Sequence, residues 1–155
     1  MELTYEKMKK FMMDYYADFN RYANDIETIH KMKEYWTPNF KVVAYFQFRG
    51  GKSPTMYSTR KEFQDFLGST PNGMKNSLNP LDIVIDEKMK KVFILTKLIK
   101  TNINTGDETE IFGMGFYQLV IDGDGKFKID SLDFICDAQD KIKKADDEDS
   151  FIYAF

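Results

Sequence analysis

Cysteine and histidine are almost missing from this chain of 155 residues, which contains one of each. A single cysteine has no partner for an internal disulfide, and one cysteine with one histidine is too few for a zinc site of the Cys/His type. Cys136 follows an apolar, strand-like run and has no basic neighbour to activate its thiol, so we expect it to be buried and inert. The cysteine and histidine counts therefore exclude a disulfide and a Cys/His zinc site, and we expect neither a metal nor a cofactor.

An excess of positive charge and a long apolar run are also absent. Lys and Arg number 22 against 25 Asp and Glu, which gives a net charge of -3. This balance provides no excess of basic residues to bind phosphate backbones, so nucleic acid is not an expected partner. No window approaches the roughly 18 uncharged apolar residues of a membrane span, and the N-terminus lacks the pattern of a cleaved leader. We expect a soluble, cytoplasmic protein that does not bind membranes.

Repeats, proline-rich linkers and low-complexity blocks are absent up to about residue 137, so we expect one domain over residues 1–137. Residues 138–155 differ in composition, because a mixed charge run at 141–149 is followed by four large apolar residues in the last five positions. Such a tail is either disordered or docked on the protein.

Aromatic residues are the abundant class, with 14 Phe, 9 Tyr and 1 Trp making up 15% of the chain. This content predicts either a large apolar interior or a cavity lined by rings. Composition alone does not distinguish the two.

The first part of the chain has the spacing of helices. Between residues 4 and 22, apolar residues recur at intervals of three and four, which predicts an amphipathic helix. Asn24 and Glu27 have the spacing of a capping box, which predicts a second helix that ends at residues 37–39. The buried face of this second helix would consist of Ile26, Ile29 and Trp36.

A short third helix and five strands complete the predicted elements. Thr59 and Glu62 form another capping box, and the helix they open ends at Gly68. A turn at residues 122–125 lacks two of the carboxylates that a calcium loop requires, which indicates a hairpin. Strand-like runs occupy residues 40–48, 78–85, 91–101, 109–121 and 126–136. Helices followed by an antiparallel meander predict an α+β fold.

Three segments resemble the nuclear transport factor two-like superfamily, which includes ketosteroid isomerase, scytalone dehydratase, hexachlorocyclohexane dehydrochlorinase and the SnoaL-type polyketide cyclases. They are residues 24–29 (NDIETI), 36–40 (WTPNF) and 125–134 (GKFKIDSLDF), and the resemblance extends over about 5–137. It implies a cone-shaped barrel made of a strongly curved antiparallel sheet, with N-terminal helices over its concave face. A pocket would open at one end, and two copies would form a homodimer through the outer sheet face.

The resemblance places only part of the family's catalytic machinery on this chain. Asp18 matches the helix aspartate of the dehydratase-like members, but Ser77 stands where their histidine is expected. The general base of the isomerase-like members would fall near Ala44 and their second acid near Met114. Tyr45 matches a catalytic tyrosine of scytalone dehydratase, so Asp18 and Tyr45 are the candidate catalytic residues.

If successive residues are about 100° apart, Asp18 lies at the edge of the apolar stripe that is centred on Tyr15, flanked by Phe11 and Tyr22. Among aromatic rings its ionised form would be disfavoured, which suits a general base. The alternative is a carboxylate that is hydrogen-bonded to a tyrosine or an asparagine at the rim of a pocket.

The last two strands carry further candidates with open alternatives. Ile129, Ser131 and Asp133 would share one face by the two-residue period, and Asp133 could join Asp18 in the pocket. Alternatively, the opposite face of this strand is buried and Asp133 is solvated. Gly113 and Gly115 either leave room for a ligand or let a helix approach, and strand curvature would explain both without a ligand.

Three functions remain open at this stage. We favour a small-molecule-binding protein with an apolar pocket lined by aromatic residues, whose ligand is a small apolar or aromatic compound. The alternatives are a cofactor-independent lyase, isomerase or cyclase that uses Asp18 and pocket tyrosines, and a structural dimerisation domain with a filled pocket. The residues expected to contact a ligand are Tyr15, Phe19, Tyr22, Ser77, Met114, Phe116, Ser131, Asp133 and, as part of a C-terminal lid, Phe155.

Overall fold

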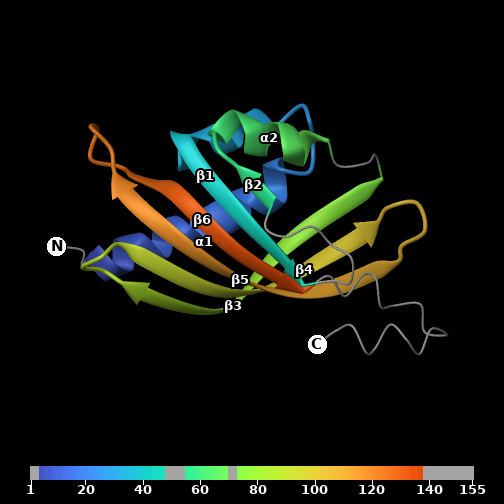
Figure 1. Ribbon diagram of the computed structural model, residues 1–155. Helices are drawn as coiled ribbons and strands as arrows, with labels where there is room; N and C mark the ends of the chain where they lie inside the picture. The colour runs from blue at the N-terminus through green and yellow to red at the C-terminus, as the bar shows by residue number, and fades with distance from the viewer. Residues whose placement is uncertain (1–3, 48–54, 70–72, 138–155) are drawn as a thin grey trace.

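A computed structural model describes residues 4–47, 55–69 and 73–137. Helices precede most of the strands, as the sequence predicts (Figure 1). In chain order the elements are the helix α1 (Thr4–Tyr22), the 3-10 helix η1 (Ile29–Tyr35), the strands β1 (Trp36–Gln47) and β2 (Thr55–Tyr57), the helix α2 (Arg60–Gly68), and the strands β3 (Met74–Asp86), β4 (Lys91–Asn102), β5 (Glu108–Ile121) and β6 (Phe127–Asp137). The tail with Phe155 lies outside the described residues, so its predicted role as a lid stays a prediction.

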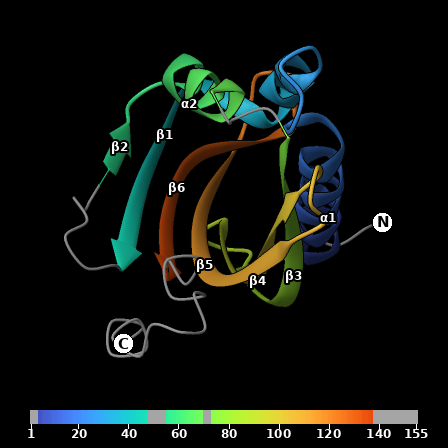
Figure 2. The same cartoon turned by 90° about the vertical axis from the view of Figure 1, so that its right-hand side faces the viewer.

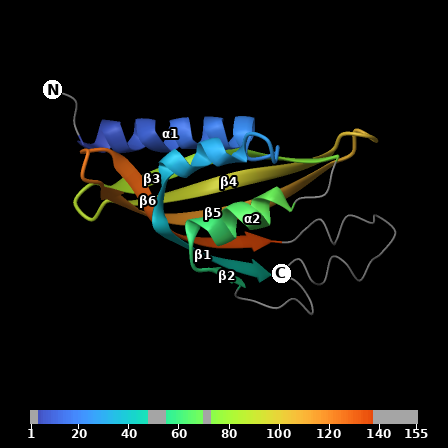
Figure 3. The same cartoon turned by 90° about the horizontal axis from the view of Figure 1, so that it is seen from above.

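The six strands form one curved sheet in the order β2-β1-β6-β5-β4-β3. Strands β3 to β6 pair antiparallel as a meander, which confirms that prediction. Strand β1 pairs parallel to β6, so the sheet is mixed and not wholly antiparallel. Figures 2 and 3 show α1, η1 and α2 gathered on the concave side of the sheet. The fold is therefore α+β, with helices over the concave face and an unclosed sheet.

Helix α1 buries the face that its periodicity predicts. Every fully buried residue of this helix belongs to one stripe, which faces the sheet. The buried residues are Met8, Met12, Tyr15, Tyr16 and Phe19. One flank of the same helix carries Lys7, Lys10 and Asp14, which remain exposed. The helix thus separates a packed interior from a charged surface.

The predicted second helix is wrong in its length and in its cap. Only a 3-10 helix forms at 29–35, and Ile26 is 72% exposed. Asn24 does not cap a helix, because its side chain accepts from the backbone N–H of Asn76 and donates to the carbonyl of Asn76, both at 2.7 Å. Long-range pairing with the start of β3 outweighs the local capping pattern here.

Strand β1 begins earlier than predicted, at Trp36, and runs through a proline. The pairing between β1 and β6 shifts register between Trp36 and Lys41, so Pro38 falls in an irregular stretch of the ladder. Proline has no backbone N–H, and this absence costs little stability at Pro38 because no regular hydrogen bond of the β1–β6 ladder depends on it. Trp36 and Ile29 are buried, as predicted, although Trp36 is on a strand.

Two local predictions are confirmed by hydrogen bonds. The hydroxyl of Thr59 accepts from the backbone N–H of Glu62 at 3.2 Å, which caps α2. At the β5–β6 turn, the carboxylate of Asp122 accepts from the N–H groups of Asp124 and Lys126 at 2.9 Å each. Gly125 completes this turn with a φ of 76°, in the left-handed region that glycine tolerates best.

Candidate functional site

Three hydroxyl groups meet in the interior between α1 and the concave face of the sheet. The hydroxyl of Tyr16 lies 2.8 Å from that of Thr96 on β4 and 3.0 Å from that of Tyr117 on β5. All three side chains are buried. Buried hydroxyls are costly unless they are paired, and this set, which we call the hydroxyl cluster, pairs internally.

Tyr15 and Trp36 extend the hydroxyl cluster towards η1 and α2. The indole N–H of Trp36 donates to the hydroxyl of Tyr15 at 3.3 Å, and the Trp36 ring stacks on Phe40 with centroids 5.4 Å apart. Burial raises the pKa of Tyr15, Tyr16 and Tyr117, so these phenols stay protonated at neutral pH. The interior here is a closed network of rings and hydroxyls.

The two glycines on β5 do not leave space in this interior. A Cβ atom at Gly113 would lie 2.5 Å from the ring of Phe134, and one at Gly115 would lie 2.7 Å from the ring of Tyr117. Both glycines are buried on the concave face. Aromatic rings therefore fill the volume that the missing side chains vacate, and this part of the interior is packed.

Strand alternation places several predicted ligand contacts on the convex face. On β5, Gly115 and Tyr117 are buried while Met114 and Phe116 are exposed, with Phe116 at 45%. Tyr45 on β1, at 40%, likewise lies on the face opposite to the buried Val42 and Ala44. The structure does not bring Tyr45, Met114 or Phe116 to the side of the sheet where α1 lies.

Asp133 and Ser131 also lie on the convex side of β6. A register shift between β5 and β6 leaves Asp130 without a partner residue on β5, so both Ile129 and Leu132 are buried although they are three positions apart. The uninterrupted two-residue period assumed from the sequence is therefore wrong. Asp133 is exposed and pairs in register with Phe116, so it does not converge with Asp18.

The remaining predicted contacts lie on or beside α1. Tyr15 and Phe19 are both buried, with ring centroids 6.0 Å apart. Tyr22 is half-buried, and the ammonium of Lys31 lies 4.8 Å from its ring centroid. Ser77 is half-buried on β3, where its hydroxyl accepts from the side-chain amide of Asn79 at 3.2 Å. Tyr15 and Phe19 are thus core residues, whereas Tyr22 and Ser77 occupy separate places at the edge.

Asp18 is held by a tyrosine from η1. The hydroxyl of Tyr35 donates to the Asp18 carboxylate at 2.5 Å. Burial and this carboxylate together raise the pKa of Tyr35, so the phenol remains the donor at neutral pH. Of the two alternatives for Asp18, the structure shows the carboxylate that is hydrogen-bonded to a tyrosine.

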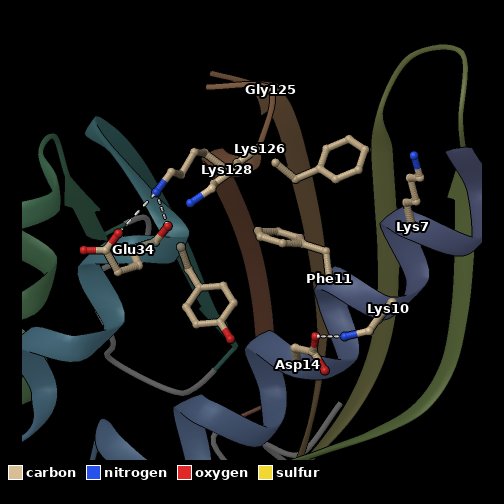
Figure 4. Close-up of a pocket in the computed structure, with 10 residues that line it drawn as sticks. Lys7, Lys10, Phe11, Asp14, Glu34, Gly125, Lys126 and Lys128 are labelled. Carbon is tan, nitrogen blue, oxygen red and sulfur yellow. Dashed lines mark hydrogen bonds and ion pairs between the residues drawn. The ribbon is translucent and has the colours of Figure 1, made fainter. Parts of the chain in front are cut away.

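The ring of Tyr35 also lines an open pocket of about 550 Å³ on the flank of α1. This pocket, which we call the flank pocket, lies between α1, the end of η1 and the β5–β6 turn (Figure 4). Its residues are Lys7, Lys10, Phe11, Asp14, Glu34, Tyr35, Gly125, Lys126, Phe127 and Lys128. The sequence alone did not predict this pocket, because its residues come from three segments that are far apart in the chain. The one local signal is the Lys-Phe-Lys sequence directly after the predicted turn.

Three aromatic rings form the floor of the flank pocket. The ring centroid of Phe11 lies 5.5 Å from that of Tyr35 and 5.9 Å from that of Phe127, and both pairs are tilted by about 50°. All three rings are half-buried and pack against the core. The floor is therefore apolar and is fixed in position by the packing beneath it.

Lysines dominate the rim of the flank pocket. The ammonium of Lys10 pairs with Asp14 at 2.6 Å, and that of Lys128 lies 3.8 Å from the Glu34 carboxylate and donates to its backbone carbonyl. Within the described residues, Lys7 and Lys126 are the rim lysines that form no ion pair. Figure 4 shows Lys7 on one side of Phe11, and Lys126 with Lys128 on the other.

A membrane-spanning helix and a metal-binding group are both absent from the residues that the structure describes. No helix among them is both long and apolar enough to cross a membrane. In the same ranges, no group of three His, Cys, Asp or Glu side chains is arranged to hold a metal ion.

No protein-family model matches the sequence, and a search of the curated proteins found no match. Solved structures do match. The epoxide hydrolase/cyclase-like enzyme SalBIII, which has a role in pyran ring formation in the polyether salinomycin, aligns with 18% identity and a TM-score of 0.62, over 87% of this chain and 94% of its own.

Two further solved structures agree with this match. A putative polyketide cyclase from Xanthomonas campestris pv. campestris aligns with 15% identity and a TM-score of 0.62, over 86% of this chain and 92% of its own. A ketosteroid isomerase-like protein from Erwinia carotovora atroseptica aligns with 14% identity and a TM-score of 0.58, over 84% and 94%. The chain therefore shares the curved α+β fold of these three solved structures, which is the fold implied by the resemblance of its sequence to the nuclear transport factor two-like superfamily.

Proposed function

We propose that this protein binds a small organic molecule in the flank pocket. The observation that carries the proposal is the floor of three aromatic rings in an open pocket of about 550 Å³. Ligand pockets are commonly about 300–1,000 Å³ and combine an apolar lining with a few polar groups. The packing of the hydroxyl cluster supports this location, because aromatic rings fill the space beside Gly113 and Gly115.

Ligand screening with a floor variant tests this function. A panel of small aromatic compounds is titrated into the full chain, and binding is detected by ligand-observed NMR and by thermal stabilisation. We expect Phe11→Leu to weaken binding about tenfold, because it removes the central ring of the floor. The control is Phe66→Leu, which removes an exposed ring on α2. A panel without any binder, or equal affinity in both variants, would contradict the proposal.

The second candidate is a cofactor-independent lyase, isomerase or cyclase that transfers a proton with Asp18. The hydrogen bond from Tyr35 favours it, because Tyr35 lines the flank pocket and its hydroxyl holds the Asp18 carboxylate, although Asp18 itself is not part of the lining. The carboxylate would accept a proton from a carbon next to a ligand carbonyl and return it to water or to another ligand carbon.

Proton exchange tests this activity without knowledge of the substrate. The protein is incubated with small aryl ketones in D₂O, and deuterium at the carbon next to the carbonyl is followed by NMR. The expected result is exchange above background that Asp18→Asn abolishes and Asp65→Asn, on α2, leaves unchanged. Exchange that persists in Asp18→Asn would rule out this role.

We also propose a homodimer through the convex face of the sheet. Large apolar side chains gather there on neighbouring strands, and the rings of Phe93 and Phe116 lie 4.8 Å apart. Exposed apolar patches of this kind are typical of association surfaces. Phe116→Asp should convert a dimer to a monomer in sedimentation experiments, whereas Ile103→Asp, at the β4–β5 turn, should not. A wild-type monomer at high concentration would contradict the proposal.

A further inference from the structure

The rim of the flank pocket has the opposite charge to the molecule as a whole. Four lysines face two carboxylates there, an excess of two positive charges, while the whole chain carries a net charge of -3. Asp122, at the same turn, does not line the pocket; its carboxylate accepts from the N–H groups of Asp124 and Lys126, and these bonds together with Lys126 and Lys128 lower its pKa, so it keeps its negative charge. The excess of lysine among the side chains that line the pocket nevertheless favours a negative charge on a ligand there.

The two carboxylates of the rim already have partners. Asp14 is paired with Lys10 on the same helix, and Glu34 is paired with Lys128 across the pocket. The charges that remain available are those of Lys7, near the start of α1, and Lys126, in the β5–β6 turn. These ammonium groups come from two elements that lie on opposite sides of Phe11 (Figure 4). An anion over the floor would thus meet donors from two directions.

The floor selects the remaining part of the ligand. Phe11, Tyr35 and Phe127 present tilted rings, to which another aromatic ring can pack by its face or its edge. We propose that the flank pocket is specific for a flat aromatic compound that carries an anionic group, with the ring on the floor and the anion between Lys7 and Lys126. This inference rests on the proposed function, since it names the class of ligand for the same pocket.

The test compares three probes that share a naphthalene ring and differ in the charge and chemistry of the group attached to it. A naphthalene carboxylate, the corresponding carboxamide and the corresponding phosphate ester are titrated into the full chain, and dissociation constants are measured by ligand-observed NMR. We expect the two anionic probes to bind at least tenfold more tightly than the carboxamide. The preference should shrink when the salt concentration is raised from about 20 mM to about 500 mM, because salt screens exposed charges. The ratio between carboxylate and phosphate indicates which anion the rim prefers.

Variants connect this preference to the two lysines. Lys7→Gln and Lys126→Gln each remove one charge from an exposed side chain, so folding should be unaffected. We expect each to weaken binding of the carboxylate by about threefold and the double variant by about tenfold, while carboxamide binding does not change. Lys88→Gln, in the β3–β4 turn, is the matched control and should bind as the wild type does.

The possible results separate this inference from the function on which it rests. Equal binding of the carboxylate and the carboxamide, or an unchanged preference in the double variant, would overturn the anion specificity and leave small-molecule binding in place. Failure of every probe to bind, charged or neutral, would overturn both.

Discussion

The two sides of α1 differ in how their polar groups are satisfied. On the side that faces the sheet, the hydroxyls of Tyr16, Thr96 and Tyr117 bind one another in a buried network. On the flank, the pocket leaves Lys7 and Lys126 without ion-pair partners among the described residues. Internal pairing stabilises the fold, whereas unpaired groups beside a pocket are available to a ligand. Changes on the two sides should therefore have separable effects on stability and on binding.

The largest effect is expected from Trp36→Ala on the packed side. Trp36 is buried among Tyr15, Phe40 and Phe63, so its removal leaves a large cavity. We expect a loss of about 4 kcal/mol in the free energy of unfolding, measured by urea denaturation. If this variant does not fold, Trp36→Phe provides a milder change, expected to destabilise in the same direction. The control is Ile103→Ala, at the exposed β4–β5 turn, and an equal loss there would contradict the assignment of the core.

The next largest effect is expected from alkaline pH, which should lower the free energy of unfolding through the buried tyrosines. Burial raises the pKa of Tyr15, Tyr16 and Tyr117, so above about pH 10 these groups ionise in the unfolded chain but not in the folded one. The unfolded state then binds fewer protons, and the free energy of unfolding falls by about 1.4 kcal/mol per tyrosine for each pH unit. This stability is complete below pH 10 and is lost as pH rises towards the folded pKa. Tyrosinate absorbance that rises near pH 10 for every tyrosine, in a protein that remains folded, would contradict this account.

Gly115→Ala tests whether the interior is filled. The new Cβ would lie 2.7 Å from the ring of Tyr117, which is buried and bonded to Tyr16 and so has little freedom to move. We expect a loss of about 2 kcal/mol in unfolding free energy. Gly123→Ala, at the β5–β6 turn, meets no atom within 4 Å and should be nearly neutral. A neutral Gly115→Ala would indicate that the interior has unfilled space.

The smallest of these stability effects is expected from Tyr16→Phe. This change removes the central hydroxyl of the cluster and leaves those of Thr96 and Tyr117 to find new partners. We expect a loss of about 1.5 kcal/mol in thermal or chemical unfolding. Tyr45→Phe, with an exposed hydroxyl on the convex face, should change stability by less than about 0.5 kcal/mol. Identical values for the two variants would mean that the cluster contributes nothing.

The sequence predicts those parts of the fold that local periodicity determines. The stripe of α1, the cap at Thr59 and the β5–β6 turn depend on residues within a few positions of one another, and all three are confirmed. The second helix failed because Asn24 binds the backbone of Asn76, a partner 52 positions away. The parallel pairing of β1 with β6 likewise has no local signal.

The candidate site was less accessible to sequence reasoning. A two-residue period shows which residues share a strand face but not which face is buried, so the sequence could not show that Met114 and Phe116, which were expected to contact a ligand, lie on the convex face. Asp130, which has no partner residue on β5, then reverses the alternation of buried and exposed residues along β6. Asp18 was identified because the resemblance implies an aspartate on the first helix, and because Asp18 lies at the edge of the apolar stripe of that helix. Its partner Tyr35 and the flank pocket require knowledge of how α1, η1 and the β5–β6 turn meet.

Mapping the bound ligand tests the central claim most directly. Backbone amide resonances of the full chain are followed by NMR while the naphthalene carboxylate is added. If the two sides of α1 are divided as we describe, the largest shifts occur at Lys7, Phe11, Tyr35 and residues 126–128, and the amides of Tyr16, Thr96 and Tyr117 change little. Shifts concentrated at Thr96 and Tyr117, with the flank pocket unaffected, would place the ligand in the interior and contradict the account.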